Sequence, residues 1–387
     1  MEYRRIGKSG WDVSILSFGC MRFHDAETAS AAVRRAVELG VNYFDVAPCY
    51  CNGNSEPWLG AALKGLDRSR LIITAKSSPG NGGVGLCDYD PKGGFGIRTA
   101  DEARRQIERS MELLGVDHLN MYQFWALHSE NIFQEGLKKG GFLEGVLKAH
   151  EEGLFDYVGM TTHAEAAEII HFVKDSPYEF DMVTLPFNLV NAGRMEAVEY
   201  CADRGIGVAA MNPLGGGLLA RNVPLMNDLA ERAGADSMAE ASLRFVAYTP
   251  GMTTALNGIT YAEHAEVGAA AVCAGPLGND AEAMLTERLA EIYASVNPHN
   301  LCTACGYCGQ CPMGILVPKV LAAFTDMRIP STAEAARAEV AAKLAAGEEG
   351  WDPSLCDKCR QCEEKCPNRI PVTQLMEAAV EIWPKIS

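Results

Sequence analysis

The residues with the most distinctive chemistry in this sequence are cysteines gathered in two short runs near the C-terminus. The first run reads CTACGYCGQCP and the second reads CDKCRQCEEKCP, so each contains four cysteines and ends in a Cys-Pro pair. The N-terminal stretch MEYRRIGKSG lacks the apolar core of a secretion signal. Without such a signal, clustered thiols are typical of metal ligands rather than of a disulfide framework. The thiols belong to Cys302, Cys305, Cys308, Cys311, Cys356, Cys359, Cys362 and Cys366.

The spacing within the two runs indicates iron–sulfur clusters. The second run follows the bacterial ferredoxin spacing C-x2-C-x2-C-x3-C-P, and the first differs only in its last gap. Three thiolates on a tight loop can cap three irons of a cubane, whereas the fourth turns toward the other cluster. Structural zinc sites of the C-x2-C type are the alternative. We therefore expect two [4Fe–4S] clusters, which either transfer electrons or only stabilise the fold. The expected ligand sets are Cys302, Cys305, Cys308 and Cys366 for one cluster, and Cys356, Cys359, Cys362 and Cys311 for the other.

The rest of the chain has the pattern of a protein with parallel strands. From Ser14 to about Ala270, apolar runs such as VSILSFG and VNYFDVA alternate with helix-like runs such as ETASAAVRRAVELG. Strands that are apolar throughout are typical of a parallel sheet covered on both faces. Eight strand–helix pairs can be traced, which predicts a (β/α)8 TIM barrel. A doubly wound open sheet is the alternative, but no G-x-G-x-x-G motif opens the first pair. The leading MEYRRIGKSGWDVS predicts a short hairpin.

The composition changes near Asn297, where the cysteine runs and an Ala-rich helical stretch begin. We therefore predict a barrel over residues 1–296 and a C-terminal α-helical ferredoxin-like domain over 297–387. The net charge of −16 argues against binding to nucleic acid or to an anionic membrane surface, and no apolar run is long enough to span a bilayer. We expect a cytoplasmic protein that acts on a small-molecule substrate, and a redox partner protein is possible.

The barrel region resembles the aldo-keto reductases, and the whole chain resembles their branch with a C-terminal ferredoxin-like domain. The resemblance rests on NYFDVAPCYCNGNSEPWLGAAL, LIITAKSS, YVGMTTHAEAAEII, VAAMNPLGGGLL and the cysteine runs. In that family a Tyr protonates the substrate carbonyl, a nicotinamide delivers hydride, and a Lys and an Asp lower the pKa of the Tyr. The resemblance assigns these roles to Tyr50, Lys76 and Asp45. All three are expected near strand C-termini, where barrel active sites are built. A cationic Lys beside a phenol makes the phenol a better acid.

The family's fourth catalytic residue is a His at the end of the fourth strand, and here Trp125 aligns with it. His128 follows three residues later, which is about 10 Å along a strand and on the opposite face. An indole N–H can donate one hydrogen bond but does not titrate. We therefore predict altered reductase chemistry, such as reduction of a conjugated C=C bond. Packing at the barrel mouth is the alternative role for Trp125.

The positions that contact a nicotinamide in the family are partly changed. Thr184 aligns with the usual Gln, Asn212 with the usual Lys, and the segment NGITYAEHAEVG has no cation for a 2′-phosphate. NAD(H) is thus more plausible than NADP(H), and a flavin is not excluded. The resemblance places the candidate cofactor-binding residues at Thr161, Thr184, Met211, Pro213, Leu214, Gly215 and Gly258.

Two functional hypotheses follow. The first is an iron–sulfur oxidoreductase of aldo-keto reductase type that reduces a carbonyl or conjugated C=C bond with Tyr50 as proton donor. The second is an electron-transfer or partner-binding protein whose barrel has lost nicotinamide-dependent catalysis. A third metal site is a further option, because Cys20, Cys49, Cys51 and Cys87 are expected at the catalytic end of the barrel.

Overall fold

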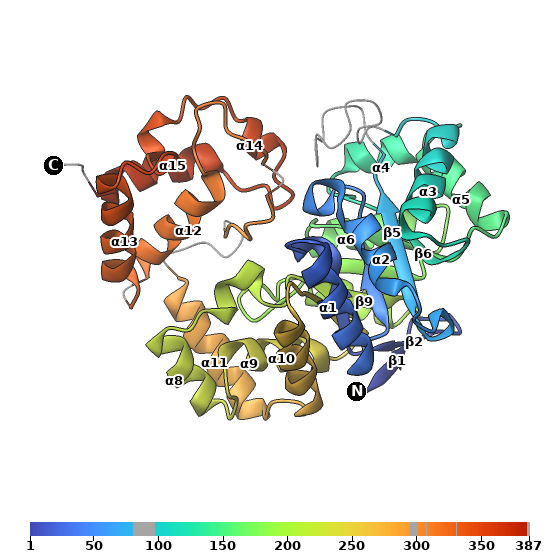
Figure 1. The fold of residues 1–387 in the computed structure, drawn as a ribbon, viewed down its shortest axis with the longest axis horizontal. Helices are drawn as coiled ribbons and strands as arrows, with labels where there is room; N and C mark the ends of the chain where they lie inside the picture. Colours follow the sequence, from blue (N-terminus) through green and yellow to red (C-terminus); the bar gives the residue numbers. More distant parts are fainter. Residues whose placement is uncertain (80–96, 295–300, 307, 330, 385–387) are drawn as a thin grey trace.

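The computed structural model describes residues 1–79, 97–294, 301–306, 308–329 and 331–384. Its centre is a closed barrel of parallel strands in the order β10-β3-β4-β5-β6-β7-β8-β9, surrounded by helices (Figure 1). The predicted (β/α)8 barrel is therefore confirmed, and the pairing of β10 with β3 excludes an open sheet. The barrel strands are β3 (Leu16–Gly19), β4 (Tyr43–Asp45), β5 (Ile72–Ser77), β6 (Leu119–Phe124), β7 (Phe155–Thr161), β8 (Met182–Pro186), β9 (Gly207–Met211) and β10 (Thr254–Gly258).

A short antiparallel hairpin precedes the barrel, as the N-terminal sequence predicts. It pairs β1 (Tyr3–Arg5) with β2 (Asp12–Ser14). The helices that follow are α1 (Ala26–Glu38), α2 (Ser55–Leu63), α3 (Ala100–Leu114), α4 (Glu130–Gly136), α5 (Phe142–Glu151), α6 (Ala166–Asp175), α7 (Met195–Ala202), α8 (Pro224–Arg232), α9 (Met238–Tyr248), α10 (Ala262–Cys273) and α11 (Asn279–Ile292).

Local sequence signals set the ends of several of these helices. Helix α3 begins at a capping box in which the side chains of Thr99 and Glu102 satisfy each other's backbone N–H groups. It ends at Gly115, whose φ of 64° is a left-handed conformation that glycine adopts without a steric penalty. Helix α1 starts at a similar box formed by Asp25 and Thr28. These helices pack against the barrel and fix where the strand ends lie.

The C-terminal part has a hydrophobic core of its own. Its helices gather as a separate lobe beside the barrel, drawn in orange to red (Figure 1). Val320, Phe324, Met376 and Trp383 are among its buried residues, and the Trp383 indole N–H donates to the Trp351 carbonyl at 2.8 Å. The domain boundary expected near Asn297 lies outside the described residues. The helices of this part are α12 (Val317–Arg328), α13 (Ala333–Ala345), α14 (Gln361–Glu364) and α15 (Val372–Ile382).

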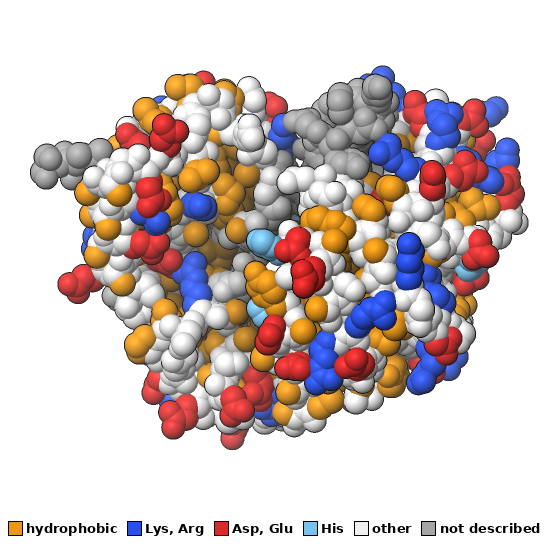
Figure 2. All heavy atoms as spheres, viewed as in Figure 1, with side chains coloured by type: hydrophobic (Ala, Val, Ile, Leu, Met, Phe, Trp, Pro, Cys, Tyr) orange, Lys and Arg blue, Asp and Glu red, His pale blue; other side chains and the backbone are white. Residues whose placement is uncertain are grey.

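The surface carries both acidic and basic side chains, and it is hollowed between the C-terminal part and the barrel (Figure 2). Within the described residues, no helix has the length and apolar character needed to cross a membrane.

Candidate active site

The strand register brings the candidate residues Asp45 and Lys76, together with Gln123, to one inner face of the barrel. Asp45 on β4 pairs with Thr74 on β5. Lys76 lies two residues beyond Thr74, so its side chain points to the same face, and Gln123 on β6 pairs directly with Lys76. Asp45, Lys76 and Gln123 therefore meet inside the barrel near the C-terminal ends of the strands.

These residues form a buried polar network. Lys76 Nζ bonds to Asp45 Oδ1, and each of the two side chains is only 2% exposed. Gln123 Nε2 donates to Asp45 Oδ2 at 2.8 Å and to Thr74 Oγ1 at 2.9 Å. Thr184 Oγ1 in turn donates to Gln123 Oε1 at 3.0 Å. Asp45 thus accepts hydrogen bonds from both Lys76 and Gln123. Because Gln123 holds the Asp45 carboxylate, that carboxylate fixes the position of the Lys76 ammonium.

Tyr50 lies above this network, in a 3-10 turn that follows β4. The turn spans Tyr50–Gly53, and it places Cys51 and Asn52 at φ values of 54° and 53°. The Lys76 ammonium nitrogen lies 5.0 Å from the centre of the Tyr50 ring. A positive charge at this position favours the phenolate form of a phenol.

Trp125, and not His128, takes the place beside Tyr50. The two rings of Tyr50 and Trp125 meet edge to face, with centres 6.0 Å apart. His128 is buried elsewhere, with its ring 5.1 Å from that of His163. Burial lowers the pKa of His128, and the neighbouring His163 and Arg369 add to that effect. His128 accepts a hydrogen bond from the backbone N–H of His163 at 3.1 Å and does not line the cavity described next.

One cavity of about 420 Å³ collects the predicted catalytic residues Asp45, Tyr50, Lys76 and Trp125. Gly215 instead lines a smaller neighbouring cavity, whereas the next two glycines, Gly216 and Gly217, line the main one. The predicted cofactor-binding residues that do line the main cavity are Thr161, Thr184, Met211, Pro213, Leu214 and Gly258.

Gln123 and Thr74 belong to the network although sequence reasoning did not single them out. Each is a polar residue within a strand that is buried along its whole length. Such a residue in the apolar stretch MYQF is a signal in itself, because a buried polar group needs a partner.

The structure brings thiols of the two cysteine runs together. Burial raises the pKa of the Cys302 thiol to about 12, and the nearby thiols of Cys305, Cys308 and Cys366 contribute to the rise. These are the four residues predicted to share one cluster, and we call them the inner site. We call the other four cysteines of the two runs, Cys311, Cys356, Cys359 and Cys362, the outer site. Burial raises the pKa of Cys362 to about 12, with contributions from Cys308 of the inner site and from Cys356.

The donor chemistry fits iron–sulfur clusters better than single ions. No three Cys, His, Asp or Glu side chains within the described ranges are close enough to hold one metal ion. A single zinc ion needs four ligands at about 2.3 Å or less, whereas a cubane of four irons spreads its thiolates more widely. The four thiols of the inner site therefore fit a cubane of four irons better than a single zinc ion.

The scattered cysteines give no third metal site within the described part of the chain. Cys20 is buried close to Asp45 and Lys76, and burial raises its pKa. The thiol of Cys51 lies 3.7 Å from the Cys20 carbonyl oxygen, which it can reach as a weak donor. Cys87 lies outside the described residues.

Comparisons with known proteins identify both parts of the chain. Residues 15–287 match the model of the Aldo/keto reductase family, and residues 301–370 match that of the 4Fe-4S dicluster domain. L-galactose dehydrogenase of Arabidopsis thaliana is 28% identical over an alignment of 238 residues, and the match covers 58% of this chain and 69% of that protein. Versiconal hemiacetal acetate reductase of Aspergillus parasiticus is 27% identical over an alignment of 262 residues, and the match covers 61% of this chain and 74% of that protein.

The fold is also found in a solved structure, that of aldo-keto reductase AKR11C1 from Bacillus halodurans in its holo form. It superposes with a TM-score of 0.62 at 22% identity, covering 75% of this chain and 96% of that one. The chain is therefore an oxidoreductase that belongs to the aldo/keto reductase family and carries a 4Fe-4S dicluster domain at its C-terminus.

Proposed function

We propose that this protein reduces a carbonyl or conjugated C=C bond of a small organic substrate, with Tyr50 as the proton donor. The observation that carries the proposal is the meeting of Tyr50, Lys76 and Asp45 in one cavity at the C-terminal end of the barrel. Tyr50 borders the open cavity, whereas the ion pair beneath it is almost fully buried. This is the arrangement expected of a donor and the charges that tune it.

Each residue of the group has a separate task. Tyr50 gives its proton to the substrate oxygen or carbon, and the Lys76 ammonium stabilises the phenolate that remains. Asp45 and Gln123 hold Lys76 in place, and Trp125 bounds the space in which the substrate lies. A nicotinamide, when bound, supplies a hydride.

The lining of the cavity favours NAD(H) over NADP(H). The Lys and Arg side chains among the described lining residues are Lys76 and Arg22. Lys76 is paired with Asp45, and Arg22 donates to the carbonyl oxygens of Thr303 and Ala304 at 3.1 and 3.2 Å. A 2′-phosphate would need a cation of its own.

We further propose that the inner site holds one [4Fe–4S] cluster through Cys302, Cys305, Cys308 and Cys366. The outer site, made of Cys356, Cys359, Cys362 and Cys311, would hold the second. The grouping of the inner site follows the thiols that lie near Cys302, and the outer site takes the remaining four cysteines of the dicluster domain.

One observation favours the alternative of an electron-transfer protein without nicotinamide chemistry. Thr184 stands where the family has a Gln that contacts the cofactor, and its hydroxyl is engaged with Gln123. A barrel of this kind would keep its clusters and its fold but would not reduce substrates.

The test is an anaerobic assay of the iron-loaded protein with aldehydes, ketones and enones. NADH, NADPH and dithionite are supplied separately as reductants, and product is measured by chromatography. The proposal predicts reduction of at least one class of substrate, with NADH preferred over NADPH. Absence of product with every reductant, combined with reducible clusters, would support the electron-transfer alternative.

A further inference from the structure

The main cavity is closed on one side by the C-terminal part of the chain. Thr303 and Cys305 line it together with Tyr50 and Trp125. Cys305 is one of the four cysteines of the inner site. A wall of the barrel cavity is therefore made by the loop that carries inner-site thiols.

Close backbone contact holds this loop against the barrel. Gly216 follows β9 with a φ of 71°, and a Cβ atom on it would lie 2.5 Å from the Cα of Thr303. A side chain larger than hydrogen at this position would displace the loop. The absence of a side chain at Gly216 thus allows the two segments to touch.

Arg22 makes hydrogen bonds between the barrel and the same loop. It lies in the turn after β3, and its guanidinium donates to the Thr303 and Ala304 carbonyls at 3.1 and 3.2 Å. These two residues stand directly between Cys302 and Cys305 in the sequence. The guanidinium also lines the cavity. Arg22 therefore places a positive charge between the cavity and the inner site.

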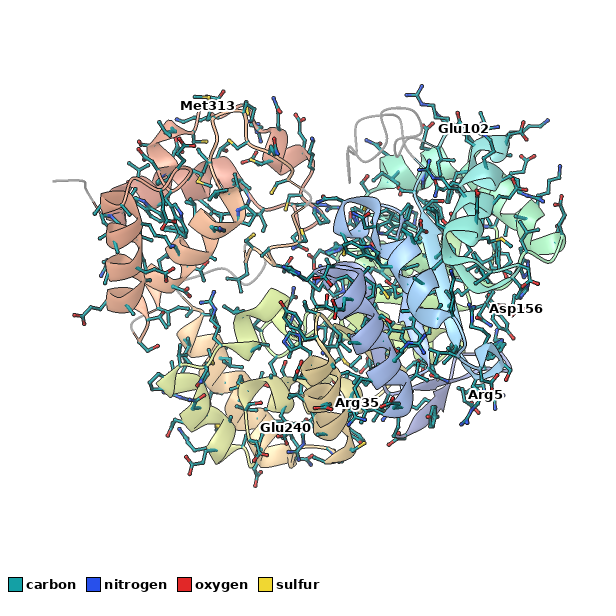
Figure 3. All side chains as sticks on the ribbon, viewed as in Figure 1. Arg5, Arg35, Glu102, Asp156, Glu240 and Met313 are labelled. Carbon is teal, nitrogen blue, oxygen red and sulfur yellow. The ribbon has the colours of Figure 1, made fainter. Side chains whose placement is uncertain are left out.

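The outer site lies on a more open surface. Cys359 is exposed, whereas Cys302 is only partly so. Met313 and Leu355, which stand beside Cys311 and Cys356 in the sequence, are 43% and 46% exposed. Figure 3 shows Met313 at the rim of the C-terminal part.

We propose that Arg22 is a positioning residue that joins the barrel cavity to the inner site and raises the reduction potential of the cluster held there. Reduction adds negative charge to a cluster, and a nearby cation stabilises that charge. Lys365 is a second cation near this site, because its ammonium lies 3.7 Å from where a Cβ atom on Gly309, the neighbour of Cys308, would be. Lys358 follows Cys356 of the outer site by two residues and is paired with Glu377. The inference rests on the proposed function only in requiring both clusters to be bound.

The test is a redox titration of the full iron-loaded chain, followed by electron paramagnetic resonance. Cys308→Ala and Cys359→Ala first assign the signals of the inner and outer clusters. Arg22→Gln is expected to make the inner cluster about tenfold harder to reduce, which is about 59 mV for one electron, without shifting the outer one. Arg22→Lys keeps the positive charge, and its inner cluster is expected to have a reduction potential close to that of the wild type. Lys358→Gln is the matched control and is expected to shift the outer cluster alone.

A second variant covers the case in which Arg22→Gln loses the inner cluster. Gly216→Ala keeps every charge but pushes the 302–305 loop away from the barrel, and it is expected to alter the inner signal alone. Selective loss of the inner signal in Arg22→Gln, with retention in Arg22→Lys, would equally support the proposal. Equal shifts of both clusters, or no shift in either Arg22→Gln or Gly216→Ala, would overturn it.

The outcome can be separated from that of the proposed function. The titration needs no substrate and no turnover. A shift in Arg22→Gln in a protein that reduces nothing would leave the inference standing and remove the proposed function. If the reduction potential of the inner cluster did not change in Arg22→Gln and the protein reduced substrates through Tyr50, the inference would be overturned and the proposed function would stand.

Discussion

The indole of Trp125 meets the ring of Tyr50 edge to face, with ring centres 6.0 Å apart and an angle of 85° between the planes. The residue next to the proposed proton donor is therefore one that does not titrate between pH 5 and 9. The relatives implied by the family resemblance have a His here, whose charge changes near pH 6.5.

Replacing Trp125 tests its role beside Tyr50. Trp125→His is expected to introduce a new ionisation near pH 6.5 in the profile of kcat/KM, because an imidazole then borders the substrate. Trp125→Phe keeps an aromatic ring but loses the N–H donor, and a loss of up to about 10²-fold is expected if that donor polarises the substrate. A pH profile that is identical in Trp125→His and the wild type would show that this position does not touch the reaction.

The buried ion pair of Asp45 and Lys76 should matter strongly for stability. Asp45→Leu leaves the Lys76 ammonium buried without its carboxylate, and we expect a loss of about 3–5 kcal/mol in the free energy of unfolding by urea. The double variant Asp45→Leu/Lys76→Met removes both charges and is expected to recover a large part of this loss.

An exposed ion pair provides the control for that measurement. Lys8 and Glu179 are bonded at 2.7 Å, but their side chains are 62% and 67% exposed. Lys8→Met is expected to cost about 1 kcal/mol or less. Equal costs for Asp45→Leu and Lys8→Met would contradict the burial of the first pair.

Glu56 should make the stability depend on pH. Burial raises the pKa of this carboxyl from 4.5 to about 7, and the nearby Ser110 hydroxyl, Arg109 and Lys76 oppose the rise. Neither of its oxygens makes a hydrogen bond of good geometry within the described residues. The folded state therefore favours the protonated form of Glu56. The contribution of this preference to the free energy of unfolding is complete below pH 4.5 and is lost as the pH rises to about 7.

Glu56→Gln removes this dependence. At pH 8 the variant is expected to be more stable than the wild type by up to about 3 kcal/mol, whereas at pH 4.5 the two should be nearly equal. Urea unfolding at both pH values checks the prediction. A variant that loses stability equally at both would show that Glu56 is needed in its ionised form.

The interleaving of the cysteine ligands can be tested one residue at a time. Cys366→Ala should perturb the cluster that depends on Cys308, although Cys366 belongs to the second run of the sequence. Cys311→Ala should perturb the cluster that depends on Cys359. The measurements are iron content and electron paramagnetic resonance of the reduced proteins. A sequential arrangement, with each run holding its own cluster, would give the opposite pairing of signals.

The barrel, and the meeting of Asp45, Tyr50 and Lys76 at one cavity, could be predicted because their signals are local. Apolar strands recur at regular intervals, Asp45 and Lys76 lie near the ends of two of them, and Tyr50 follows the first closely. The role of Gln123 could not be predicted, because one polar residue in a buried strand does not reveal which neighbour it bonds. The junction of Arg22 with Thr303 spans 281 positions of the chain, and no local pattern encodes a contact of that range.

The domain match and the cysteine spacing both indicate [4Fe–4S] clusters. The contact between the inner site and the cavity, in contrast, arises only from the tertiary structure. It depends on the bare backbone of Gly216, whose place beside Thr303 is set by the packing of the two domains. From the sequence, Gly215 of this glycine run was predicted only as a cofactor-binding residue, and nothing indicated that Gly216 contacts the C-terminal part.

The most direct test of the central claim is the rate of substrate reduction by Tyr50→Phe, measured beside the wild type with matched iron content. Tyr261→Phe, which alters a tyrosine with 42% exposure, is the control. We predict that Tyr50→Phe loses about 10²–10⁴-fold in kcat, while its cluster signals and its free energy of unfolding stay unchanged and Tyr261→Phe keeps full activity. A Tyr50→Phe protein that reduces the same substrate at the wild-type rate would contradict the account, because the proton would then come from another group.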